Sequence, residues 1–260
     1  MHIPYITAHS GCEGTPQDRL DSVELALKLG ADIVEMDVRR AQDHVLRISH
    51  DALSLEGYAQ KPTLEEVFFR IRDTQLKINC DIKEAAALED IFRLAEQAGL
   101  RKDQLILSGC TSPEQLARDE SIVKKSTVLL NVEELLKFFY LAEGLPGWDE
   151  DFKRLMQSPW GILRNIPEPE VYLNWHLDKI IEFSKLLQVG GINLPYWCLT
   201  DQLASAFREN GIFFSVWTVN EADRMERCIR LGAGNITTRT VRLALDTRER
   251  CMRTLAERSQ

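Results

Sequence analysis

The chain has 260 residues, of which 44% are hydrophobic and 28% charged, and its formal net charge is −8. This length and composition predict one large globular domain, and since no run of Lys or Arg forms a basic stripe, we expect no nucleic-acid partner. No apolar stretch is long enough to span a bilayer, so we expect no stable membrane insertion. The six cysteines are scattered without a Cys-x-x-Cys pair, which predicts reduced thiols and a cytoplasmic location.

Strand-like and helix-like segments alternate about eight times along the chain. We expect strands over residues 3–8, 32–38, 76–82, 104–108, 126–131, 191–194, 212–219 and 235–237. Amphipathic helices fill the intervals, and the first is expected over residues 18–29, ended by Gly30. Such an alternation predicts a parallel sheet covered by helices, and eight units at this length predict an α/β fold, a (β/α)₈ TIM barrel in one domain over residues 1–260.

Local signals define several helix starts and one irregular region. Thr63 with Glu66 forms a capping box, and Ser112 followed by Pro113 predicts a helix N-terminus. Glycines and prolines interrupt the chain at about residues 144–170, where we expect an irregular excursion with short helices rather than a second domain. Between Asp51 and Pro62 we expect a polar link, with little or no insertion after the second strand.

The stretch from Glu35 to Asp51 carries the first chemical signal. Glu35 and Asp37 lie two apart on a strand and therefore share a face, where a divalent cation with oxygen ligands would relieve their repulsion. A hairpin turning near His44 would bring His50 roughly level with Asp37. The alternative interpretation is an exposed hairpin with an ordinary Glu and Asp on its hydrated face.

Chemically capable residues recur where the expected strands end, which is where active sites of this fold lie. These residues are His9, Glu35, Asp37, Asp81, Lys83, Trp217 and Asn220.

Four motifs in order resemble the glycerophosphodiester phosphodiesterase family, a phospholipase-C-like phosphodiesterase barrel, over nearly the whole chain. The first motif, A-H-S-G, resembles the family's His-Arg-Gly. The second, E-M-D-V followed by Asp43 and S-H-D, resembles the family's Glu-x-Asp, a turn containing Asp, and a strand that ends in His-Asp. Asp81-Ile82-Lys83 resembles its Glu-x-Lys, and the segments at 216–220 and 235–238 resemble its last two strands.

The resemblance implies a role for each matching residue. Glu35, Asp37 and Asp81 would hold one divalent cation, Mg²⁺ or Ca²⁺, as cofactor. His9 and His50 would be the general acid and base. Lys83 would contact the phosphate and Trp217 would line the pocket. These groups suit phosphodiester hydrolysis, because a cation and an ammonium stabilise the developing charge and imidazole protonates the leaving alkoxide.

The chain departs from the family pattern at Ser10, which stands where the family has arginine, at Leu20 and at Thr238-Arg239. A serine hydroxyl gives a phosphate oxygen one neutral hydrogen bond, whereas arginine gives two charge-assisted ones. We expect Arg39, on the strand face of Asp37, to replace the missing contact, with Arg40 and Arg239 as further candidates.

Several of these residues also have a purely structural interpretation. His9 could be a core histidine, Asp81 and Lys83 a plain salt bridge, and Trp217 barrel packing. Glu84 could replace Asp81 as a ligand, although its parity puts it on the other face, and Asn220 could cap the following helix.

The expected function is metal-dependent hydrolysis of a glycerophosphodiester, or a related small phosphodiester, to glycerol phosphate and an alcohol, a reaction of lipid metabolism. One alternative is a phospholyase that yields a cyclic phosphate. The other is a degenerate barrel that binds a phosphorylated ligand without turnover.

Overall fold

Eight parallel strands close into a barrel in this computed structural model, which describes residues 3–143, 163–164 and 168–257. The barrel strands are β1 (Tyr5–Ala8), β2 (Ile33–Arg40), β4 (Lys77–Ile82), β5 (Leu105–Gly109), β6 (Thr127–Asn131), β7 (Gly191–Pro195), β8 (Phe214–Trp217) and β9 (Asn235–Thr238). Closure comes from β1, which pairs in parallel with both β9 and β2. The predicted TIM barrel is therefore confirmed.

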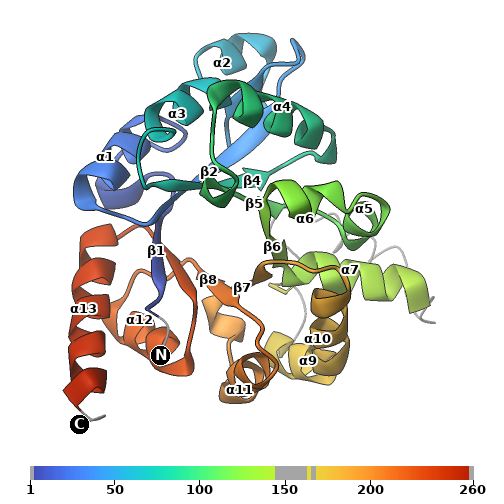
Figure 1. Cartoon of the computed structure of the whole chain (residues 1–260), viewed down its shortest axis with the longest axis vertical. Helices are drawn as coiled ribbons and strands as arrows, with labels where there is room; N and C mark the ends of the chain where they lie inside the picture. Colours follow the sequence, from blue (N-terminus) through green and yellow to red (C-terminus); the bar gives the residue numbers. More distant parts are fainter. Residues whose placement is uncertain (1–2, 144–162, 165–167, 258–260) are drawn as a thin grey trace.

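Helices form a ring around these strands (Figure 1). They are α1 (Asp21–Leu29), α2 (Leu55–Ala59), α3 (Leu64–Ile71), α4 (Leu88–Ala98), α5 (Pro113–Arg118), α6 (Ser121–Lys125), α7 (Val132–Glu143), α9 (Pro169–Trp175), α10 (Leu177–Leu186), α11 (Asp201–Glu209), α12 (Ala222–Leu231) and α13 (Val241–Glu257). The two predicted caps are confirmed, since Thr63 and Ser112 each accept a backbone N–H and form complete capping boxes. In the described ranges, no helix is both long and apolar enough to cross a membrane.

Side-chain alternation along β2 separates the two faces of the barrel wall. Val34 and Met36 are fully buried in the large apolar core between the strands and the helices. Ile33 instead packs with Ile106 and Leu129 in a small apolar cluster inside the barrel. Glu35 and Asp37 share the parity of Ile33 and therefore point into the barrel, towards its C-terminal end.

The predicted hairpin is also present. The outer end of β2 pairs antiparallel with β3 (Leu46–Ile48), and His44 adopts φ 63° in the turn between them. The backbone N–H of Ser49 donates to the carbonyl of Asp37 at 3.0 Å. His50 is thus level with the end of the barrel portion of β2, as predicted.

Three expectations differ from the structure or lie beyond it. The first helix begins at Asp21 rather than at residue 18, because Asp18 has φ 56° and its N–H is bonded by the Ser10 hydroxyl at 2.9 Å. The link after Asp51 contains the short helix α2, whose N-cap is Ser54. Most of the expected excursion at 144–170 lies outside the described residues.

Candidate active site

Three carboxylates meet at the C-terminal end of the barrel, at the inner ends of β2 and β4. Asp37 and Asp81 are direct neighbours in the register of these strands, and Glu35 lies one pleat deeper. One carboxylate oxygen from each residue lies within 4.8 Å of the others. This span and an all-oxygen donor set fit Mg²⁺ or Ca²⁺, whose ligands lie about 2.0–2.6 Å from the ion.

Burial makes the three carboxylates difficult to ionise together. Burial raises the pKa of Glu35 to about 8, and the charge of Asp81 adds to the effect. Burial and the neighbouring Glu35 and Asp81 raise the pKa of Asp37 to about 7. Burial also acts on Asp81, but Lys83 outweighs it and lowers the pKa of that carboxyl. The cluster therefore favours uptake of a proton or a cation.

Lys83 bridges two of the three carboxylates from just beyond β4. Its Nζ lies 2.6 Å from Asp37 Oδ1 and 2.7 Å from Asp81 Oδ2. Burial alone would lower the pKa of Lys83, but the two carboxylates raise it above its usual value, so the ammonium stays charged. An ammonium has three donors, and these two contacts leave one N–H for a further acceptor.

His9 follows β1 at the same end of the barrel, and its side chain is 21% exposed. Its Nδ1 lies 2.9 Å from the carbonyl of Ser10 and 3.7 Å from Glu35 Oε2. The shorter contact assigns the proton to Nδ1, so that Nε2 carries the free lone pair. Burial lowers the pKa of His9, although the Ser10 carbonyl opposes the effect, and the ring is therefore mostly neutral near pH 7.

His50 follows β3 in the hairpin, and no hydrogen bond or ion pair among the described residues joins it to His9 or to the three carboxylates. Its side chain is 64% exposed, and its Nδ1 is 2.8 Å from Asp51 Oδ1. Arg39 Nε donates to the His50 carbonyl at 3.0 Å and so fixes the backbone there. The hydrogen bond to Asp51 leaves Nε2 of His50 available to a ligand, and its role as acid or base stays a prediction.

Arg39 is engaged away from the carboxylate cluster. Its guanidinium pairs with Glu84, whose second carboxylate oxygen accepts the backbone N–H of Arg40 at 3.2 Å. Glu84 therefore binds Arg39 and the Arg40 backbone, and Asp81 rather than Glu84 belongs to the carboxylate cluster. The proposed phosphate contact of Arg39 stays a prediction, and in this arrangement it requires the Glu84 pair to open.

Ser10 and Trp217 differ in their contacts. Ser10 is 1% exposed, its backbone N–H approaches Glu35 Oε2 at 3.4 Å, and its hydroxyl is used by Asp18. Trp217 ends β8 on the face of Ser215, which bonds Asn235 inside the barrel. Its indole Nε1 is buried and has no hydrogen-bond partner among the described residues. The roles of Ser10 and Trp217 in substrate binding remain predictions.

One supporting residue escaped the sequence-based interpretation, and another has a different role from the one expected. Gly109 has φ +80°, and a Cβ built there would lie 2.3 Å from Asp81 Oδ1, so only glycine leaves room for that carboxylate. Asn220 does not cap α12, whose N-cap is Glu221. Its Oδ1 instead accepts the backbone N–H of Arg239 at 2.9 Å. A glycine directly after an expected strand was the available signal for Gly109.

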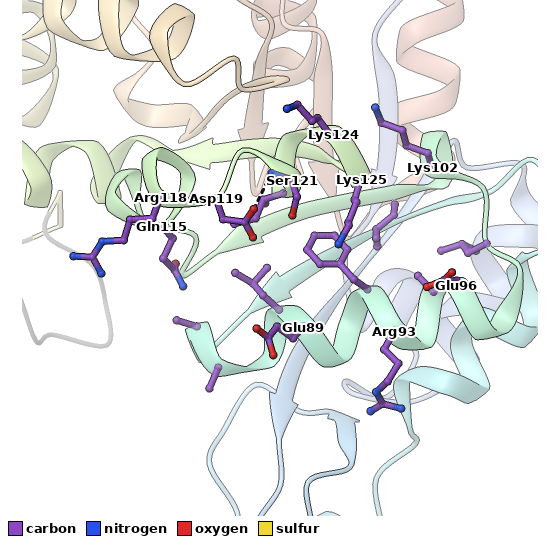
Figure 2. A pocket seen from close by; sticks show the side chains of 18 of the residues that line it. Glu89, Arg93, Glu96, Lys102, Gln115, Arg118, Asp119, Ser121, Lys124 and Lys125 are labelled. Carbon is purple, nitrogen blue, oxygen red and sulfur yellow. Dashed lines mark hydrogen bonds between the residues drawn. The ribbon is translucent and has the colours of Figure 1, made fainter.

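A large pocket lies elsewhere on the molecule. A groove of about 1110 Å³ runs between α4 and the α5–α6 segment on the outer side of the barrel (Figure 2). Its polar rim includes Lys102, Lys124 and Lys125, and Lys125 lies over the ring of Phe92. None of the candidate site residues lines this groove.

Known proteins resemble the chain over nearly its whole length. A glycerophosphodiester phosphodiesterase of Caldanaerobacter subterraneus subsp. tengcongensis is 24% identical over 243 residues, covering 90% of this chain and 93% of that protein. The chain is similar to glycerophosphodiester phosphodiesterases. The predicted resemblance is thus confirmed, although no family model matches the chain.

Solved structures share this fold. A glycerophosphodiester phosphodiesterase from Parabacteroides distasonis superposes with a TM-score of 0.65 at 19% identity, covering all of this chain and 99% of the other. A phosphodiesterase from Oleispira antarctica, in complex with the product sn-glycerol-3-phosphate, gives 0.63 at 16% identity, with 94% and 96% coverage. Both comparisons support the single barrel.

Proposed function

We propose that this protein is a phosphoric diester hydrolase that cleaves glycerophosphodiesters to glycerol phosphate and an alcohol, with one divalent cation as cofactor. The observation that carries the proposal is the convergence of Glu35, Asp37 and Asp81 beside His9. The names of the similar proteins supply the substrate class. A cation bound by the three carboxylates supplies positive charge to the phosphate oxygens and polarises the phosphorus centre.

His9 is suited to accept a proton in this reaction. With its proton on Nδ1, held by the Ser10 carbonyl, Nε2 accepts the proton of an attacking hydroxyl, from water or from the glycerol itself. The lowered pKa of His9 keeps this nitrogen unprotonated near neutral pH. In the proposal His50, oriented by Asp51, protonates the leaving alkoxide.

Lys83 connects the carboxylates to the substrate. The contacts to Asp37 and Asp81 hold the Lys83 ammonium at the cluster. In the proposal, its third N–H donates to a nonbridging oxygen of the phosphate. Such charge-assisted hydrogen bonds contribute about 1.5–3 kcal/mol each. Lys83 thereby stabilises the charge that spreads over these oxygens in the transition state.

A substrate panel tests the proposal. The protein is stripped of metal with a chelator and assayed with glycerophosphodiesters of different head groups after addition of Mg²⁺, Ca²⁺ or Mn²⁺, with sn-glycerol 3-phosphate as the readout. We expect cation-dependent release, and a His9→Ala variant that folds normally should lose it. Phosphorus NMR of the product distinguishes hydrolysis from a phospholyase, which would leave a cyclic phosphate. Binding without turnover under every cation would favour a degenerate barrel.

A role in lipid metabolism and a cytoplasmic location belong to the same proposal. All six cysteines are free thiols in the structure, which fits a reducing compartment. Fractionation of the producing cells tests the location.

A further inference from the structure

Ser10 stands where the resemblance implies an arginine, and the structure offers an arginine from another strand. We propose that Arg239 binds the phosphate group of the substrate. This inference rests on the proposed function, because it assigns a residue to the phosphate position of the same site. It differs from the expectation for Arg39, whose guanidinium is paired with Glu84.

The register of the barrel places Arg239 beside His9. Strands β1 and β9 pair in parallel with Thr7 opposite Thr237 and Ala8 opposite Thr238, and the His9 N–H donates to the Thr238 carbonyl at 2.9 Å. The next residues in this register are His9 and Arg239. Consistently, Arg239 Nε lies 3.4 Å from His9 Nδ1.

The strand parity of Arg239 directs its side chain to the barrel interior. Residues 235, 237 and 239 share one face of β9 and its extension. Asn235 on that face bonds Thr7 Oγ1 and Ser215 Oγ across the inside of the barrel. Arg239 lies two pleats above Asn235, past the end of β9, and therefore faces the mouth of the carboxylate site.

The backbone of Arg239 is fixed on both sides. Its N–H donates to Asn220 Oδ1 at 2.9 Å, and its carbonyl accepts the N–H of Glu13 at 2.7 Å. The guanidinium has no carboxylate partner within the described residues, unlike that of Arg39. Because His9 Nδ1 donates its proton to the Ser10 carbonyl, it has no lone pair to accept the Arg239 N–H, and the N–H donors of Arg239 remain available to an anion.

The net charge of the site also favours a further positively charged side chain. Three carboxylates and the Lys83 ammonium leave two negative charges, which one divalent cation neutralises. A diester monoanion would then meet no net attraction at the site. The Arg239 guanidinium supplies the missing positive charge, in the planar form that binds two phosphate oxygens at once.

Binding of sn-glycerol 3-phosphate and of inorganic phosphate tests this assignment. Titration calorimetry with saturating Mg²⁺ would compare the wild-type protein with Arg239→Ala, Arg239→Lys and Arg242→Ala. Arg242 is an exposed arginine three residues away, so its variant removes the same formal charge without touching the site. Neither alanine variant alters the apolar core, and thermal unfolding checks that all proteins fold.

We expect Arg239→Ala to weaken binding of both anions about tenfold or more, with Arg239→Lys intermediate and Arg242→Ala within twofold of wild type. With a glycerophosphodiester as substrate, Arg239→Ala should raise KM by a similar factor and leave kcat within a few-fold. Equal anion binding by wild type and Arg239→Ala would overturn the inference, as would equal losses in both alanine variants. A fall in kcat at unchanged KM, with an altered pH profile, would show that Arg239 acts through His9 instead. If the wild type cleaves no diester but Arg239→Ala still loses anion binding, the proposed function fails and the assignment of Arg239 stands.

Discussion

Replacing Glu35 by glutamine should stabilise the metal-free protein at alkaline pH, and this outcome tests the electrostatics of the carboxylate cluster. Glu35 is buried beside Asp37 and Asp81, so its folded-state pKa is about 8 against an ordinary 4.5. A raised carboxyl pKa means that the folded state binds the proton more tightly than the unfolded state. Stability is therefore fully present below about pH 4.5 and is lost as the pH rises towards 8.

The size of the effect follows from the two pKa values. At about 1.4 kcal/mol per pH unit, ionising Glu35 costs the folded state on the order of 4 kcal/mol by pH 8. Uptake of protons by neighbouring groups reduces this figure, and we expect Glu35→Gln to gain about 2–4 kcal/mol at pH 8 in a chelator. Little hydrogen bonding should be lost to offset this gain, because the glutamine carbonyl oxygen can still accept the Ser10 N–H. For a chain of this size it corresponds to a rise in Tm of about 5–10 °C.

Thermal and urea unfolding between pH 4.5 and 8.5 measure the effect, with EDTA and then with saturating Mg²⁺. The matched control is Glu65→Gln on the exposed face of α3, which should not change the pH slope. In Mg²⁺ the order should reverse, because the wild-type protein gains binding free energy and Glu35→Gln does not. A Glu35→Gln variant that is less stable than wild type in EDTA at pH 8 would refute the reasoning.

Four further outcomes concern neighbouring residues. His9→Ala should lower kcat about a hundredfold or more, with the fold intact by circular dichroism. His50→Ala should lower kcat by a similar factor if His50 is the general acid. Wild-type kcat in either variant would exclude the acid or base role of the residue replaced. Lys83→Met should destabilise the chelated protein by about 3–5 kcal/mol in urea unfolding, since the buried Asp37 and the partly buried Asp81 lose their ammonium. The loss should be far smaller in Mg²⁺, and an equal loss in both conditions would contradict this. Gly109→Ala should weaken Mg²⁺ binding about tenfold in titration calorimetry, because its Cβ would displace Asp81, and unchanged affinity would show that the carboxylate tolerates the shift.

Local patterns were sufficient for the fold. Each barrel strand begins and ends within two residues of its expected bounds, because β-branched runs bounded by glycines and helix caps are short-range signals. The start of α1 was wrong because the Ser10 hydroxyl bonds the Asp18 N–H, an interaction between side chain and backbone eight residues apart. The helix α2 was missed because five residues give too little periodicity to recognise.

The site was predictable where it depends on strand parity alone. Glu35, Asp37 and Asp81 meet because their strands are neighbours in register, which the sequence order of a TIM barrel implies. The pairing of Arg39 was not predictable in this way. Arg39 shares the face of Asp37, but Glu84 reaches its guanidinium from the loop after β4, and such a tertiary contact leaves no trace in the spacing.

Cation-dependent turnover tests the central claim most directly. The measurement is release of sn-glycerol 3-phosphate from a glycerophosphodiester by chelator-treated protein, before and after addition of a divalent cation, for the wild type and Glu35→Gln. We expect activity to return with the cation in the wild type and to stay at background in the variant. Equal activity of the wild type in chelator and in cation, or full activity of Glu35→Gln, would contradict it.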